Sequence, residues 1–258
     1  MSADGERWFL LNASPDVRDQ LTRLPVPTPE GVRHVPVECV VLTDAELDHT
    51  LGIVLLREAR RLQITATDAV RRVIEDDSRL LPVTRAFADV SVTELLPDRP
   101  TELCYRDGTG SGLRVTGFPV PAGPPRFARE ERPNHTVGLV IQDGRTGGTC
   151  AFIPGCGGLD DALMARLAAA DLVLFDGTFW TDDELIRLGV STKRARDMGH
   201  LPQSGPGGML EALKPLAARK ILIHINNTNP ILDEDSPERA ALEAAGIEVA
   251  YDGMELEL

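Results

Sequence analysis

The sequence predicts a single α/β domain over residues 1–258, because segments of strand character alternate with segments of helix character for most of its length. A chain of 258 residues can bury a sizeable core, and its contents of 42% hydrophobic and 26% charged residues are ordinary for a globular protein. No internal repeat or low-complexity block interrupts the alternation. The expected architecture is therefore an α/β fold with one core.

The first half of the chain contains two clear strands. The expected elements are a strand at Arg7–Leu11, a turn at Asn12–Asp16, a short helix at Asp16–Leu24, a buried strand at Val37–Leu42 and a helix from about His49 to Arg61. The stretch Asp68–Gly112 has mixed polarity and several prolines. It gives weak strand signals only at Leu95, Leu96, Leu103 and Tyr105.

The second half has a more regular pattern of strands and helices. Strands are expected at Leu113–Phe118, Thr136–Gln142, Thr149–Ile153, Leu172–Phe175, Ile221–Ile225 and Ile247–Tyr251, with a hairpin turn at Asp143–Gly148. Helices are marked by Leu159, Leu163 and Leu167, by Met209, Leu210, Leu213 and Leu216, and by the N-cap Ser236 before Pro237, with Gly246 at the end.

The formal net charge of −13 comes from 27 Lys and Arg against 40 Asp and Glu. This charge argues against binding to nucleic acid or to an anionic membrane, because both reward clustered cations. The chain shows no charged-then-apolar leader and no apolar run of about twenty residues, so we expect a cytoplasmic protein. None of the four cysteines falls in a C-x-x-C pair. The sequence leaves a homo-oligomer open.

Polar side chains collect where predicted strands end. Thr43–His49 follows the strand Val37–Leu42 directly, Asp176 closes a second strand, and His224 lies at the end of a third. His200 lies in the loop Met198–Pro202. Ligands of α/β folds bind at the carboxyl ends of strands, and imidazole with carboxylate suits iron, zinc or manganese. His49, His224 and one of the aspartates are therefore candidate metal ligands.

Each of these residues also has a structural interpretation. An aspartate such as Asp48 before a helix is more often an N-cap than a ligand, and Asp176-Gly177 is a common turn pair. An isolated histidine is more often a satisfied core or surface residue. His34 is interpreted as structural, and His135 stays open between the two interpretations.

Several sequence blocks resemble one family. Thr43–His49 has the frame of the metallo-β-lactamase signature T-H-x-H-x-D-H, with Asp44 and Glu46 at the first two histidine positions and Asp48 and His49 retained. That substitution is typical of the PqqB family of pyrroloquinoline quinone (PQQ) biosynthesis. The resemblance continues at Asn12–Asp16, Asp176–Asp183, Met198–Gly208, His224–Pro237 and Tyr251–Met254.

The resemblance implies a metallo-β-lactamase-like αββα sandwich and an iron-dependent oxygenase. Such an enzyme would use Fe(II) and O₂ to hydroxylate the tyrosine ring of a cross-linked Glu–Tyr precursor, a small molecule, and zinc would be an alternative metal in the purified protein. The iron ligands would be Asp48, His49 and His224. Pocket residues with substrate-binding, orienting or proton-transfer roles would be Asp44, Glu46, Asp176 and His200.

The chemistry of the substituted residues agrees with that implication. Replacing two imidazoles by Asp44 and Glu46 removes ligands that a two-zinc hydrolase needs, and one metal with open positions remains. His200 could act as an acid or base. Asn226 and Asn227 could orient His224 or meet substrate carboxylates, and both roles stay open. Two further functions stay open: a zinc hydrolase of the same fold, and a non-catalytic carrier of PQQ or its precursor.

The start of the chain departs from the family pattern. Ser2–Glu6 matches a position well inside that pattern, so we expect the first strands, the Gly-rich loop and the Cys-rich motif for a structural zinc to be absent. The hypothesis is a truncated or mis-started reading frame, with consequences for activity. Arg7–Leu11 would then be an exposed apolar edge strand.

Overall fold

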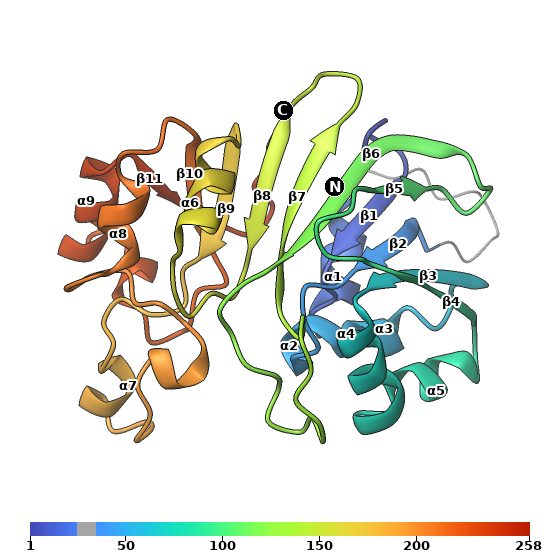
Figure 1. Ribbon diagram of the computed structural model, residues 1–258, viewed down its shortest axis with the longest axis horizontal. Helices are drawn as coiled ribbons and strands as arrows, with labels where there is room; N and C mark the ends of the chain where they lie inside the picture. Colours follow the sequence, from blue (N-terminus) through green and yellow to red (C-terminus); the bar gives the residue numbers. More distant parts are fainter. Residues whose placement is uncertain (25–34) are drawn as a thin grey trace. The chain divides into compact units, whose positions relative to one another are not determined.

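The computed structural model describes residues 1–24 and 35–258, and its backbone contacts divide into two compact units (Figure 1). Unit 1 comprises Met1–Phe118, Pro124–Val137 and Asp143–Arg145. Unit 2 comprises Pro119–Gly123, Gly138–Gln142 and Thr146–Leu258. Each unit combines a β-sheet with helices, which confirms the predicted α/β class. The single domain over residues 1–258 stays a prediction.

Unit 1 is built on a parallel four-stranded sheet. Its order is β1 (Trp8–Leu11), β2 (Val37–Val41), β3 (Arg61–Ala66) and β4 (Asp89–Glu94). All five residues of β2 are buried, as expected for an inner strand of a parallel sheet. The strands β5 (Thr101–Cys104) and β6 (Gly110–Pro119) form an antiparallel pair.

The helices of unit 1 are short. They are α1 (Val17–Arg23), α2 (Leu47–Thr50), α3 (Gly52–Leu55), α4 (Asp68–Arg72) and α5 (Leu80–Arg85), with the π-helical turn η1 (Val73–Asp77) between the last two. Figure 1 shows α3, α4 and α5 gathered on one side of β3 and β4. Apolar side chains of these helices and of the sheet form a buried core that includes Ile53, Leu62, Ile64, Ile74 and Leu81.

Unit 2 contains the parallel strands β8 (Thr149–Ile153), β9 (Leu172–Asp176), β10 (Arg219–Ile223) and β11 (Ile247–Val249). The strand β7 (Val137–Asp143) pairs antiparallel with β8, as the predicted hairpin requires. Its helices are α6 (Asp161–Ala168), α7 (Glu184–Arg187), α8 (Met209–Leu213) and α9 (Pro237–Ala244), with 3₁₀ turns η2 (Arg196–Met198) and η3 (Pro230–Leu232). Figure 1 shows α6, α8 and α9 beside β9, β10 and β11.

The signals at both ends of α9 are confirmed. The Ser236 hydroxyl accepts a hydrogen bond from the Arg239 N–H at 3.0 Å, and Pro237 occupies the first turn. Gly246 follows the helix with a φ of +67°, a conformation that glycine adopts without steric cost.

The helix predicted from about His49 to Arg61 is confirmed only as far as Leu55. The chain forms α2 and α3, and β3 begins at Arg61. At the start of α3, a Cβ on Gly52 would lie 2.2 Å from the Ser14 carbonyl oxygen, so the backbone passes very close to the turn after β1. The strands β3 and β4 were not predicted, and Leu95 and Leu96 lie after β4 instead of in a strand. The predicted strand Ile221–Ile225 ends at Ile223.

The predicted edge position of β1 is correct, but the strand is not the exposed apolar edge that was expected. The strand β1 lies at one end of the four-stranded sheet. Phe9 is fully buried, however, and its ring packs 5.5 Å from that of Tyr105. The Met1 ammonium donates to the Phe9 carbonyl at 2.7 Å, and the Phe9 N–H donates to the Met1 carbonyl at 2.8 Å. The residues before β1 therefore fold back onto the strand.

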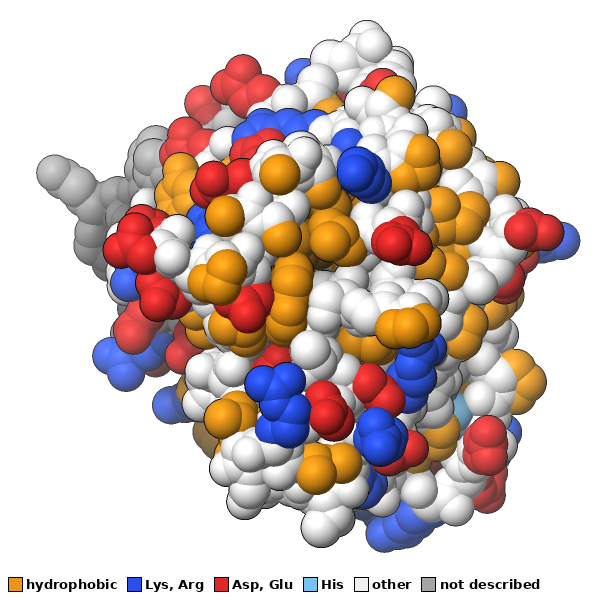
Figure 2. Space-filling model, turned by 90° about the vertical axis from the view of Figure 1, so that its left-hand side faces the viewer, with side chains coloured by type: hydrophobic (Ala, Val, Ile, Leu, Met, Phe, Trp, Pro, Cys, Tyr) orange, Lys and Arg blue, Asp and Glu red, His pale blue; other side chains and the backbone are white. Residues whose placement is uncertain are grey.

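Within residues 1–24 and 35–258, no helix has the length and apolar character needed to cross a membrane. On the face of the described chain shown in Figure 2, acidic and basic side chains are interspersed with apolar ones. This face carries no continuous basic stripe of the kind that binds nucleic acid.

Candidate metal centre

Asp44 and His49 form a buried pair in unit 1. Asp44 follows the carboxyl end of β2, and His49 lies in α2. The Nδ1 atom of His49 lies 2.7 and 2.8 Å from the two carboxylate oxygens of Asp44. The Thr43 hydroxyl donates to the same carboxylate at 2.7 Å, and the Glu46 N–H does so at 3.0 Å. With Nδ1–H donated to Asp44, the lone pair of the neutral His49 ring lies on Nε2.

Burial and charge act in opposite directions on this pair. Burial alone would raise the pKa of Asp44, but the charge and hydrogen bond of His49 and the donors around the carboxylate lower it. Burial would lower the pKa of His49, but Asp44, Asp48 and Glu46 raise it to about 9. For Glu46, desolvation together with the charges of Asp44 and Asp48 raises the pKa. The carboxylates around His49 therefore favour a positive charge on its ring.

Asn12 supports the pair from the end of β1. Its side-chain N–H donates to the Thr43 hydroxyl at 2.9 Å, and its carbonyl oxygen accepts from the Thr43 N–H at 2.9 Å. The next backbone N–H, of Ala13, donates to the His49 carbonyl at 2.7 Å. Asn12 was not predicted as a site residue, although it lies in one of the blocks that carry the resemblance.

Asp48 lies beside the imidazole of His49. Its carboxylate is 3.9 Å from Nε2, the ring atom that carries the lone pair, and its side chain is 59% exposed. Asp48 occupies the first turn of α2, and the N-cap residue of that helix is Glu46. The N-cap interpretation of Asp48 is therefore wrong, and Asp48 and His49 can offer an oxygen and a nitrogen to one cation.

A second polar cluster lies in unit 2 around Asp176, at the end of β9. Asp176 is fully buried and accepts from His200 Nδ1 at 2.7 Å and from the Thr178 hydroxyl at 2.6 Å. The Nδ1 atom of His224 lies 2.8 Å from the Thr178 oxygen. Potential ligand atoms of Asp176, His200 and His224 come within 4.8 Å of one another. The structure thus brings together the two strand-end residues Asp176 and His224 and the loop residue His200.

The loop that begins at His224 is fixed by buried hydrogen bonds. His224 itself has a φ of +55°, which is unfavourable for any residue except glycine. Asn226 donates to the Thr228 hydroxyl at 2.6 Å, and that hydroxyl donates to the buried carboxylate of Glu184 at 2.6 Å. The Asn229 side chain donates to the Gly177 carbonyl at 2.9 Å. Asn226 therefore holds the loop, while both roles considered for Asn227 stay predictions.

The remaining histidines lie apart from these clusters or outside the described residues. His135 is buried in unit 1, where its Nε2 donates to the Glu130 carbonyl at 3.0 Å. Its Nδ1 has no hydrogen-bond partner among residues 1–24 and 35–258. His34 lies outside the described residues.

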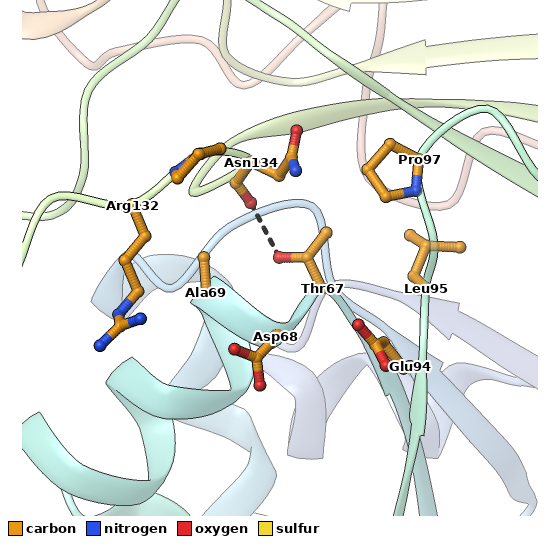
Figure 3. Close-up of a pocket in the computed structure, with 9 residues that line it drawn as sticks. Thr67, Asp68, Ala69, Glu94, Leu95, Pro97, Arg132 and Asn134 are labelled. Carbon is orange, nitrogen blue, oxygen red and sulfur yellow. Dashed lines mark hydrogen bonds between the residues drawn. The ribbon is translucent and has the colours of Figure 1, made fainter.

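A separate hollow lies in unit 1 at the carboxyl ends of β3 and β4 (Figure 3). Its lining includes Thr67 and Asp68 after β3, Glu94 and Leu95 of the other strand end, and Asn134. The Thr67 hydroxyl donates to the Asn134 carbonyl at 2.8 Å. None of the predicted site residues lines this hollow.

The two clusters have the donor chemistry of a metal site. Asp48 and His49 belong to unit 1, whereas Asp176, His200 and His224 belong to unit 2. Their donors are imidazole nitrogens and carboxylate oxygens, which fit ferrous iron, zinc or manganese. Asp44 and Thr178 each bind the ring nitrogen that a metal would not use, and such outer contacts orient histidine ligands in metalloproteins.

The sequence was compared with protein families and with curated proteins. The family model described as a beta-lactamase superfamily domain matches residues 7–225. Coenzyme PQQ synthesis protein B of Xanthomonas euvesicatoria pv. vesicatoria is 43% identical over 267 residues, covering 100% of this chain and 86% of the relative. The protein of the same name from Azoarcus sp. is 44% identical over 263 residues, with the same two coverages.

The fold was compared with solved structures. The crystal structure of Zn²⁺-bound PqqB from Methylobacterium extorquens superimposes with a TM-score of 0.87 and 38% sequence identity, covering 100% of this chain and 86% of that one. A diphosphatase of the PhnP family shares the fold with a TM-score of 0.62 at 19% identity.

Proposed function

Because the chain belongs to the PqqB family and has its metallo-β-lactamase fold, we propose that it is an oxygenase of PQQ biosynthesis. The proposed reaction is the iron-dependent hydroxylation of the tyrosine ring of a cross-linked Glu–Tyr precursor. Family membership supports the pathway, and the observation that carries the metal chemistry is the buried Asp44–His49 pair, which puts a ring lone pair beside the Asp48 carboxylate.

Asp48, His49 and His224 are the proposed iron ligands. In unit 1, Asp44 accepts the Nδ1–H of His49, so Nε2 is the ligand atom. In unit 2, the Nδ1 of His224 contacts Thr178, which again leaves Nε2 for a metal. Two histidines and one carboxylate with open positions is the donor set of non-haem ferrous oxygenases.

The bound iron would supply activation of O₂ next to the substrate. The other polar residues have roles that follow from their contacts. The Nδ1 of His200 donates to Asp176, so its Nε2 carries a lone pair that can accept a proton from a substrate hydroxyl. Asp44 holds His49 in one orientation, and Glu46 adds negative charge beside the metal ligands.

A zinc hydrolase of the same fold is the second candidate, because the M. extorquens relative is a Zn²⁺-bound protein. In that function a zinc ion held by these residues would supply Lewis-acid activation of water for hydrolysis. The residues at positions 44 and 46 are carboxylates, and Asp44 is committed to His49 and Thr43. The donor set therefore favours one metal and the oxygenase.

The proposed function is tested with zinc-free protein reconstituted anaerobically with Fe(II). We expect about one iron per chain and O₂ consumption with a cross-linked Glu–Tyr analogue, whereas zinc-loaded protein consumes none. His224→Ala should abolish both the iron and the O₂ uptake, and Asp68→Asn, away from the clusters, is the control. Turnover by the zinc form without O₂ would replace the oxygenase with the hydrolase. Substrate binding without turnover in either metal form would favour the carrier.

A further inference from the structure

The Thr178 hydroxyl lies at the centre of the unit 2 cluster. Its oxygen is 2.6 Å from Asp176 Oδ1, 2.8 Å from His224 Nδ1 and 3.1 Å from His200 Nδ1. It also lies 2.9 Å from the carbonyl oxygen of His224. Thr178 is buried. A hydroxyl has one proton to donate and two lone pairs, so only one of the neighbouring acceptors receives its proton.

The Asp176 carboxylate determines where that proton goes. Its Oδ1 accepts from the Thr178 N–H at 3.0 Å and faces the Thr178 hydroxyl at 2.6 Å. Its Oδ2 accepts from the Cys156 N–H at 3.0 Å and from His200 Nδ1 at 2.7 Å. A hydrogen bond to a charged carboxylate is stronger than one to a backbone carbonyl or to a neutral imidazole nitrogen, so the hydroxyl proton points to Asp176. These four donors fill the four acceptor positions of the carboxylate, which leaves Asp176 no lone pair for a metal.

The tautomer of His224 follows from this assignment. Because the Thr178 proton is donated to Asp176, the Thr178 oxygen can only accept a hydrogen bond from the His224 ring. The 2.8 Å contact is therefore Nδ1–H to oxygen, and the lone pair of His224 is on Nε2. The ring of His200 stacks on the ring of His224, with the two centroids 5.4 Å apart and an interplanar angle of 20°.

We propose that Thr178 is a positioning residue that selects the Nδ1–H tautomer of His224 and so presents Nε2 to the metal. Asp176 acts through Thr178 and His200 and is not itself a metal ligand. The role of Nε2 as a ligand rests on the proposed function. The tautomer itself depends only on the contacts within unit 2.

Thr178 offers a closely matched pair of variants. Thr178→Val keeps the shape of the side chain but removes the acceptor, whereas Thr178→Ser keeps the hydroxyl. Zinc-free wild-type and variant proteins carrying ¹⁵N-labelled histidine are compared by NMR, with the His224 signals assigned by their loss in His224→Gln. Zinc affinity is then measured by competition with a chelator, and thermal unfolding shows whether each variant folds.

We expect wild type and Thr178→Ser to show the Nδ1–H tautomer, and Thr178→Val to lose it together with about 10- to 100-fold in zinc affinity. An unchanged tautomer and affinity in Thr178→Val would overturn the inference. Thr178→Ala gives the same comparison if the valine variant fails to fold. If wild type shows the tautomer but binds no zinc, the proposed function fails while the selection of the tautomer by Thr178 stands.

Discussion

Asp44 shows how one substitution changes the role of a position. In the metallo-β-lactamase signature this position is a histidine, whereas here it is a buried carboxylate that contacts the ring of His49 at 2.7 Å. A carboxylate that accepts the Nδ1–H of a histidine fixes its orientation and increases the basicity of Nε2. The substitution that removes a histidine from the signature therefore also orients the ring of His49.

Asp44→Asn should weaken metal binding by about 10- to 100-fold, because an amide cannot accept from His49, Thr43 and the Glu46 N–H as a carboxylate does. Zinc competition with a chelator measures the change. Asp68→Asn, which removes an exposed carboxylate paired with Arg71 and Arg72, should leave the affinity unchanged. Equal zinc affinities of Asp44→Asn and Asp68→Asn would show that the contact of Asp44 with His49 does not support metal binding.

The thiols provide a test of burial at single residues. Burial raises the pKa of Cys39 to about 11 and those of Cys150 and Cys156 to about 12, so all three stay protonated in mildly alkaline buffer. Cys104 is only half-buried. Iodoacetamide should therefore alkylate Cys104 first, with the other three at least about a hundredfold slower. Mass spectrometry of the digested protein measures the order, and fast labelling of Cys150 or Cys156 would contradict the buried placement of β8 and the loop after it.

The charged site residues could be predicted from the sequence, whereas their neutral partners could not. Asp44 and Asp176 follow apolar strands, and strand-end carboxylates and imidazoles are an established signal. Thr43, Thr178 and Asn12 are common residue types. They matter because of the hydrogen bonds that they make to the charged site residues or to one another. That information depends on contacts between residues as far apart as Asn12 and Thr43, or Thr178 and His224.

At the scale of secondary structure, the close approach of two backbone segments explains why the predicted helix is interrupted before Gly52. The run after His49 has helical periodicity, but α3 begins at Gly52, which is packed against the turn after β1. The chain is thus divided into α2, which carries Asp48 and His49, and α3. The strands β3 and β4 could have been predicted, because RLQITA and DVSVTE alternate apolar with polar residues as half-buried strands do.

Gly52→Ala should destabilise the protein by about 1–3 kcal/mol, because its Cβ would meet the backbone oxygens of Ala13 and Ser14 at 2.7 and 2.2 Å. Urea unfolding followed by circular dichroism measures the loss. Gly123→Ala is the control: apart from its chain neighbours, no heavy atom of residues 1–24 and 35–258 lies within 4 Å of the added Cβ, so the stability should stay within about 1 kcal/mol of wild type. A loss as large for Gly123→Ala would show that the effect comes from replacing glycine in general.

At the scale of the whole molecule, the fold class and the family follow from sequence patterns spread along the chain. The αββα expectation came from the resemblance, and the fold agrees with Zn²⁺-bound PqqB at a TM-score of 0.87. The division of the chain into two compact units was not predicted, since the alternation of strands and helices runs continuously through both. The chain spans 86% of the curated relatives it matches.

The proposed oxygenase inserts oxygen from O₂ into its substrate and holds one iron through Asp48, His49 and His224. The most direct measurement is the mass of the product formed from a cross-linked Glu–Tyr analogue under isotopically labelled O₂. For an oxygenase we expect labelled oxygen on the tyrosine ring, and we expect no product with His49→Ala. Oxygen derived from water, or a product formed equally well without O₂, would contradict the proposed oxygenase.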